Sequence, residues 1–112
     1  MPVIVSEGVN KGRITWPRLV EICSYNTAKL FGLLPRKGVL AVGSDADLVI
    51  MDENKEVTVS AKTLHQLSDF TPYEGMKLKG WPILTMVRGQ VVFENGKIVG
   101  KPGTGKFLAR SL

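Results

Sequence analysis

The sequence predicts a mainly β domain with α-helices near its N-terminus. A continuous apolar block at residues 48–51 is bounded by Asp47 and Asp52, which is typical of a strand covered on both faces. Asn95-Gly96 lies between two short strand-like runs, and this dipeptide strongly favours a tight hairpin. Apolar residues at helical spacing within 16–23 predict an amphipathic helix ahead of the first strand.

Two helices are predicted, over about residues 16–24 and 27–31. Thr15 is a suitable N-cap for the first helix, and Asn26 is the predicted cap of the second. Gly32 can end the second helix in the left-handed conformation. We expect the apolar stripe of the first helix to pack on the strand at 48–51 and to form one core with it. That stripe consists of Trp16, Leu19, Val20, Ile22 and Cys23.

The polar turn at 53–55 predicts that strand 48–51 folds back on a second strand, 56–60, as an antiparallel hairpin. A further strand is expected over 76–80 and 83–88, with a break or bulge at Trp81-Pro82, because proline has no N–H to donate to a ladder.

The C-terminal part contains a hairpin and a tail. Strands at 90–94 and 97–99 flank Asn95-Gly96, and residues 71–76 are expected to form a loop. Residues 101–112 contain Pro102 and two glycines, so we expect an extended C-terminal tail.

Composition excludes several classes of protein. The 112 residues make one domain or part of one, far below the roughly 250 residues of a (β/α)8 barrel. The net charge is +5, but no block of five like charges occurs, so we expect no nucleic-acid partner. No apolar run approaches about 18 residues and no signal peptide opens the chain, so we expect no membrane partner. The single Cys23 excludes an internal disulfide and fits a reducing compartment, which favours a cytoplasmic location.

Few residues suggest chemistry. His65 is the only histidine, and one imidazole cannot form the usual multi-histidine metal site, so a surface or hydrogen-bonded role is expected. Cys23 lies in the apolar stripe and is expected to be a small buried hydrophobe. Asp45, Asp47 and Asp52 flank turns, where aspartate ordinarily bonds to backbone, and they are too few oxygen ligands for a hard cation.

Two further patterns fail their context tests. The segment 103–106 resembles half of a phosphate-binding loop but lacks the preceding strand, the full spacing and the following helix. Tyr73, Trp81 and Phe93 are too widely spaced for a platform that stacks single-stranded bases. The sequence therefore predicts no catalytic, cofactor-binding or metal-binding residues in this chain.

A set of spaced residues nevertheless resembles a known family. The pattern G-x4-G-x2-A-D-L-V-x2-D runs from Gly38 to Asp52, and it is similar to the strand on which amidohydrolase-superfamily enzymes return from their catalytic barrel to a small β-sandwich. Residues 26–33 resemble the N-P-A-K-x-F-G-L helix of D-hydantoinases and dihydropyrimidinases, with Thr27 in place of the usual proline. The segments 71–76, 87–92 and 100–107 follow in the family's order.

This resemblance implies a C-terminal fragment of a D-hydantoinase- or dihydropyrimidinase-like cyclic amidohydrolase. Residues 1–37 would be the end of the barrel, 38–100 part of the composite β-sandwich, and 101–112 the tail. Such enzymes hydrolyse a cyclic amide C–N bond with a hydroxide held between two zinc ions bridged by a carboxylated lysine. No position here matches the family's ligand motifs, so we expect this chain alone to bind neither zinc nor a small-molecule substrate and to be inactive.

An alternative is that the chain belongs to the non-enzymatic dihydropyrimidinase-related scaffold proteins and serves assembly or partner binding. In the resembling enzymes, strands from the N-terminus of the same polypeptide pair with the C-terminal strands. A chain without them would expose a strand edge, so we expect a homo-oligomer formed through that edge or through the tail.

Overall fold

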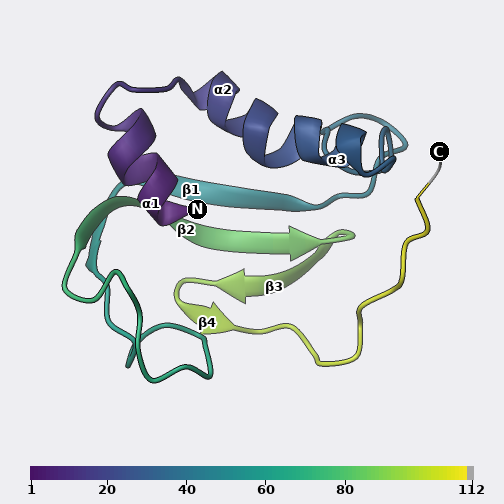
Figure 1. The fold of residues 1–112 in the computed structure, drawn as a ribbon. Coiled ribbons are helices and arrows are strands. Elements are labelled where there is room, and N and C mark those ends of the chain that lie inside the picture. Colours follow the sequence, from purple (N-terminus) through teal and green to yellow (C-terminus); the bar gives the residue numbers. More distant parts are fainter. Residues whose placement is uncertain (111–112) are drawn as a thin grey trace.

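The computed structural model describes residues 1–110, which form an antiparallel sheet with a helical layer beside it. Within these residues the sheet has the strand order β1-β2-β3-β4. The helical layer runs alongside β1, and the chain ends in a tail that passes beyond β4 (Figure 1). The predicted fold class, mainly β with α, is confirmed. The elements are α1 (Pro2–Ile4), η1 (Val5–Val9), α2 (Trp16–Val20), η2 (Glu21–Tyr25), α3 (Asn26–Leu30), β1 (Leu48–Thr58), β2 (Lys77–Val87), β3 (Gln90–Glu94) and β4 (Lys97–Ile98), where η marks a π-helical turn.

The helical layer is one continuous run from α2 through η2 to α3. It begins where Thr15 Oγ1 accepts a hydrogen bond from the Arg18 N–H at 3.3 Å, as predicted. The predicted cap at Asn26 is wrong, because Asn26 is itself helical (φ −64°, ψ −35°) and its N–H continues the π turn to the Glu21 carbonyl. Gly32 ends the run at φ +63°, as predicted.

The predicted hairpin between 48–51 and 56–60 is wrong. Both segments belong to the single strand β1, whose partner is β2. The polar residues 53–55 form a bulge instead of a turn: Asp52 faces Trp81 and Glu56 faces Lys79, so three residues of β1 lie opposite Gly80. Asp52 stabilises the bulge by accepting the Asn54 N–H at 2.9 Å. The polar residues 53–55, which favour a turn locally, therefore form a bulge because β1 pairs with β2 on both sides of them.

The bulge predicted near Trp81-Pro82 is present, and β2 continues through it. Ile50 faces Leu84 and Met51 faces Pro82, which leaves Ile83 as the extra residue. The following turns are also as predicted. Arg88-Gly89 and Asn95-Gly96 each have two successive positive φ angles, the conformation that matches the twist of two-residue hairpins.

The N-terminal segment is fastened to β2, which the sequence did not suggest. Ser6 Oγ accepts the Lys79 N–H at 3.1 Å, and Asn10 Nδ2 donates to the Lys79 carbonyl at 2.8 Å. Gly80 permits this close approach, because a Cβ atom there would lie 2.2 Å from Val5 Cγ1. Val5 is consequently fully buried, as is Leu78 beside Gly80.

The predicted single core between the first helix and strand 48–51 is only partly formed. Leu19 is buried, but its neighbour Val20 is 55% exposed and Ile22 is also exposed. The expectation that residues 48–51 are covered on both faces is wrong, since Val49 is 48% exposed and Ile50 is similar. Val49 is open because the helical layer stands off from β1 and leaves a hollow that Val49 lines. Ile50 does not line this hollow.

The tail is extended, as predicted, over residues 101–110, which contain no helix or strand. Residues 111–112 of the predicted tail lie outside the described residues.

We predict that Leu19→Ala lowers the free energy of unfolding by about 2–5 kcal/mol, because it empties a buried site that the helix cannot refill. Val20→Ala removes an adjacent, exposed side chain and is the matched control, expected to change stability by less than about 0.5 kcal/mol. Urea unfolding followed by circular dichroism measures both. Equal effects of the two substitutions would contradict the observed orientation of the helix.

Candidate functional site

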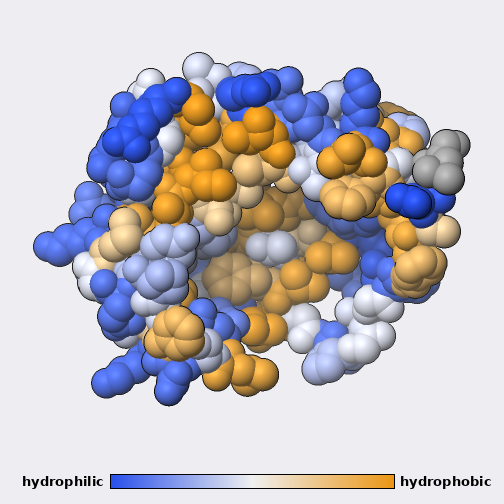
Figure 2. Space-filling model, in the orientation of Figure 1, coloured by the Kyte–Doolittle hydropathy of each residue, from blue (hydrophilic) through white to orange (hydrophobic). Residues whose placement is uncertain are grey.

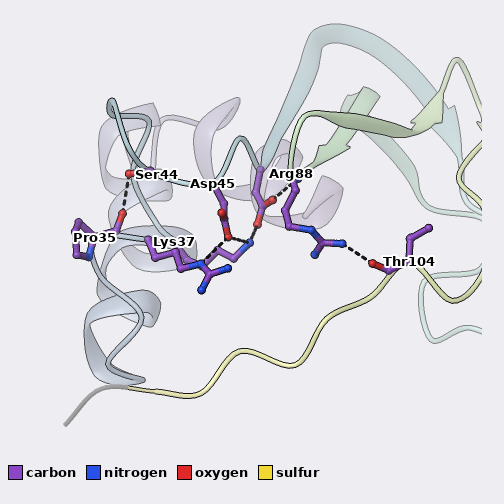
Figure 3. A network of polar contacts seen from close by, with 8 residues as sticks. Pro35, Lys37, Ser44, Asp45, Arg88 and Thr104 are labelled. Atoms are coloured by element: carbon purple, nitrogen blue, oxygen red, sulfur yellow. Dashed lines mark hydrogen bonds and ion pairs between the residues drawn. The ribbon is translucent and has the colours of Figure 1, made fainter.

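The candidate site is a network of polar contacts where the helical layer, the sheet and the tail meet (Figure 3). It is built on the connector between α3 and β1, which folds back on itself. Ser44 Oγ donates to the Pro35 carbonyl at 2.7 Å, and the Asp45 N–H donates to the Arg36 carbonyl at 2.9 Å. These bonds bring Asp45 beside the basic residues that follow the helices.

Lys37 forms ion pairs with both Asp45 and Asp47. Its Nζ lies 2.8 Å from Asp45 Oδ2 and also contacts Asp47 Oδ2. Arg36 Nε adds a third ion pair, 3.1 Å from Asp45 Oδ2. Two carboxylates at the entry to β1 are thus neutralised by two cations that follow α3.

Asp47 extends the network to the β2–β3 turn. Its Oδ1 accepts the Arg88 N–H at 2.7 Å, and the Gly89 N–H donates to the Ala46 carbonyl at 3.0 Å. Arg88 has φ +47°, which is uncommon for a residue other than glycine, and the carboxylate stabilises that conformation. The Arg88 guanidinium in turn donates to the Thr104 carbonyl, so the turn holds the tail.

The network shifts the acid–base equilibria of its members. The hydrogen bond from Lys37 is the main cause that lowers the pKa of Asp45, with Arg36 adding to it. Burial raises the pKa of Asp47, but Lys37 and the Arg88 N–H outweigh it, so the net pKa is lowered. For Lys37, burial disfavours the charged form and so lowers the pKa, but the carboxylates of Asp45 and Asp47 outweigh burial, so the net pKa is raised. All three groups are therefore held in their charged forms.

Chemically, this arrangement suits fastening rather than reaction, because each carboxylate already has cationic or N–H partners. Residues 1–110 contain no group of three or more His, Cys, Asp and Glu side chains that could hold a metal ion.

The other candidate residues lie apart from the network. His65 Nε2 is 3.1 Å from the Gly96 carbonyl and its ring meets Phe93 edge-on at 6.0 Å, so it is hydrogen-bonded as expected. Cys23 was expected to be buried, but it is only half-buried, because it lines the hollow beside β1. Asp52 serves the bulge described above.

The segment 103–106 forms no loop around a ligand. It is extended, and its Thr104 carbonyl is occupied by Arg88. The three aromatic residues lie on separate elements, with Tyr73 in a loop, Trp81 in β2 and Phe93 in β3, so they do not form a continuous strip on one element.

A second feature is the hollow between the helical layer and β1, with a volume of about 870 Å³. Hydrophobic side chains surround its centre in Figure 2. Its apolar lining includes Trp16, Leu19, Val20, Val49 and Met51, and Asp45 and Asp47 also line it.

Sequence reasoning missed Lys37 and Arg88 as members of the network. It explained Asp45 and Asp47 as turn residues, which is true of their location but omits their charged partners. The available signal was a basic pair, Arg36-Lys37, about ten residues before two aspartates across a glycine-containing connector.

The candidate site thus joins the helices to an antiparallel sheet through a charged connector. The chain belongs to the amidohydrolase family, whose pattern matches residues 3–92. It is 50% identical over 109 residues to the D-hydantoinase of Geobacillus stearothermophilus and 47% identical over 110 residues to the dihydropyrimidinase of Rattus norvegicus. These matches cover 97% and 98% of this chain but only 23% and 21% of those proteins.

Solved structures agree. A D-hydantoinase crystal structure superposes with a TM-score of 0.95 at 50% identity, covering 98% of this chain and 24% of the other. The L-hydantoinase from Arthrobacter aurescens gives the same TM-score at 46% identity, with the same coverage. The chain therefore has the structure of about a quarter of a hydantoinase-like amidohydrolase. Among the described residues no helix is long and apolar enough to cross a membrane.

We predict that Asp47→Asn flattens the acid limb of the stability profile. A carboxyl whose pKa is lowered from 3.8 on folding stabilises the protein above that pH, and the contribution is lost as pH falls through the folded pKa. The variant should therefore lose about 1 kcal/mol of unfolding free energy at pH 7 and almost none near pH 2. Denaturant melts between pH 2 and 7 test this. The exposed Asp69→Asn is the control, and an equal effect there would contradict the assignment.

Proposed function

We propose that this chain is the C-terminal structural portion of a metal-dependent cyclic amidohydrolase of the hydantoinase or dihydropyrimidinase type. The observation that supports this most is the coverage: identity of 42–50% extends over almost the whole chain, whereas the chain spans about a quarter of those relatives. The catalytic centre, with two zinc ions and a carboxylated lysine, would lie in the remainder of such an enzyme. The relatives described above are named as hydantoinases and a dihydropyrimidinase, which favours an enzyme over the scaffold alternative.

The role of the chain would be architectural. Residues 1–37 would end the barrel, residues 38–100 would belong to the sandwich, and residues 101–112 would be the tail. The polar network supports this proposal, because Lys37 follows the helices, Asp47 opens the sheet and Thr104 lies in the tail. The Asp47 carboxylate thereby fixes the helices relative to the β2–β3 turn. A segment that connects a barrel to a sandwich needs such a fixed orientation.

A chimera tests this role. We expect the G. stearothermophilus D-hydantoinase, with its aligned quarter replaced by this chain, to fold and to hydrolyse hydantoins. Two variants of the chimera, Gly80→Ala and its control Gly75→Ala, test whether the packing seen in this chain is kept in the whole enzyme. Gly80→Ala should lose stability, since the new Cβ meets Val5, whereas Gly75→Ala, at a similar positive φ but with open space, should lose less. The isolated chain should show neither turnover nor retained zinc after dialysis. A folded, metal-loaded chimera without activity would contradict the proposal, as would turnover by the isolated chain.

We also propose a cytoplasmic location and association of the chain with its own copies. The free Cys23 supports a reducing compartment. β1 is an outer strand, and its outward edge has no ladder partner among residues 1–110, which favours pairing with another strand. The bulge at 53–55 divides β1 into two stretches, before and after it, each of which is paired with β2 on its inner side. The tail offers a second route, since beyond its contact with Arg88 it is extended and, apart from the half-buried Leu108, exposed through residue 110.

Sedimentation equilibrium over a wide concentration range measures this association. We expect a dimer for the full chain, and a variant ending at Gly100 separates the two routes. If the protein that ends at Gly100 still dimerises, the contact lies at the edge of β1. If it no longer dimerises, the contact lies in the tail. A monomer in both proteins would contradict self-association.

A further inference from the structure

The β2–β3 and β3–β4 turns have nearly the same backbone conformation but differ in their first residue. Arg88-Gly89 has φ angles of +47° and +78°, and Asn95-Gly96 has φ angles of +47° and +85°. Asparagine is a favoured first residue of such turns, because it tolerates the left-handed region. Arginine does not share this tolerance. A disfavoured residue that is held in this conformation indicates that the position has a further role.

The side chain of Arg88 holds the tail. Its guanidinium donates a hydrogen bond to the Thr104 carbonyl (Figure 3). Among residues 1–110, no other hydrogen bond joins the segment 101–110 to the rest of the chain, since the bond from Thr104 Oγ1 to the Lys101 carbonyl lies within that segment. The far end of the long arginine side chain makes this contact. An asparagine would suit the turn better, but it is too short to replace the guanidinium.

Asp47 keeps Arg88 in its unusual conformation. The Asp47 Oδ1 accepts the Arg88 N–H at 2.7 Å, and the Ala46 carbonyl accepts the Gly89 N–H at 3.0 Å. These two N–H groups belong to the peptide groups on either side of the Arg88 Cα, so together the bonds fix its φ and ψ angles. The direction of the arginine side chain follows from those angles. The path of the tail therefore depends on a carboxylate that also binds Lys37 after the helices.

We propose that Arg88 and Asp47 form a releasable latch for the C-terminal tail. In the latched state, Asp47 holds Arg88 at positive φ and the guanidinium binds the Thr104 carbonyl. In the released state, Arg88 leaves the left-handed region and the tail beyond Gly100 moves freely. One hydrogen bond at the surface stabilises only modestly, so a small perturbation of Asp47 is enough to release the tail. Every contact of the latch lies within this chain, and the latch does not depend on the proposed role in a hydrolase.

Arg88→Asn tests the latch, because it removes the guanidinium and supplies the residue that suits the turn. Nuclear magnetic resonance relaxation of the isotope-labelled chain measures the release. The order parameter of the Thr104 amide should fall from about 0.85, typical of rigid backbone, to below about 0.6. The Val99 amide, whose N–H donates to the Val92 carbonyl at 3.0 Å, should stay rigid as an internal reference. Urea unfolding should show equal or higher stability for this variant, whereas a residue that merely stabilised the turn would give lower stability and a rigid tail.

Trypsin provides a second measure of release. It cleaves after Lys106 but not after Lys101, because Pro102 follows that lysine. Cleavage after Lys106 requires the neighbouring segment to be free, so its rate follows the released population. Arg88→Asn should raise this rate at least about tenfold. Arg13→Asn is the matched control, since it removes an exposed arginine whose side chain makes no hydrogen bond or ion pair within residues 1–110.

Two variants of Asp47 test its control of the latch. Asp47→Ala removes the oxygen that accepts the Arg88 N–H and should raise the cleavage rate as much as Arg88→Asn does. The two substitutions combined should raise it no further, because both act on one latch. Asp47→Asn keeps an oxygen that can accept the N–H, so it should raise the rate less than about twofold.

The results separate the parts of the latch. A Thr104 amide that is mobile in the unaltered chain, or that stays rigid in Arg88→Asn, overturns the latch. Release by Arg88→Asn without release by Asp47→Ala overturns the control by Asp47. If circular dichroism shows that Asp47→Ala is unfolded, the Arg88→Asn measurements decide the proposal. Repeating them at two protein concentrations distinguishes release of the tail from a change in self-association.

Discussion

The arrangement of helices, sheet and tail depends on the carboxylate of Asp47. One oxygen receives the charged side chain of Lys37, which follows the helices, and the other receives the main-chain N–H of Arg88 in the β2–β3 turn. Because the same side chain is shared, the two segments cannot move apart without leaving a partly buried charge unpaired, which is costly. Arg88 extends the constraint to the tail through the Thr104 carbonyl.

The rest of the chain is held less completely. The N-terminal segment is fixed on β2 because Gly80 leaves room for Val5, and together with Leu78 it forms a small, well-packed centre. Between the helices and β1, by contrast, apolar side chains face a hollow. The chain therefore has one well-packed region, around Val5 and Leu78, and one face, between the helices and β1, where apolar side chains are not fully covered.

The uncovered apolar face agrees with the comparisons, in which this chain matches only part of longer proteins. The chain belongs to the amidohydrolase family and matches about a quarter of the hydantoinases and dihydropyrimidinases that resemble it. In our proposal, its charged contacts serve to hold the helices against the sheet.

The sequence by itself determined the local features: the helix start at Thr15, the turn at Asn95-Gly96, and the fold class. These depend on side chains that act on nearby backbone, so their signals lie within a few residues. The tertiary structure alone decided that residues 53–55 form a bulge, because a long ladder with β2 outweighed a turn signal. It also decided that Lys37 and Arg88 meet at Asp47, and that the helical stripe stands off from β1. Both depend on contacts between distant segments, which no local pattern encodes.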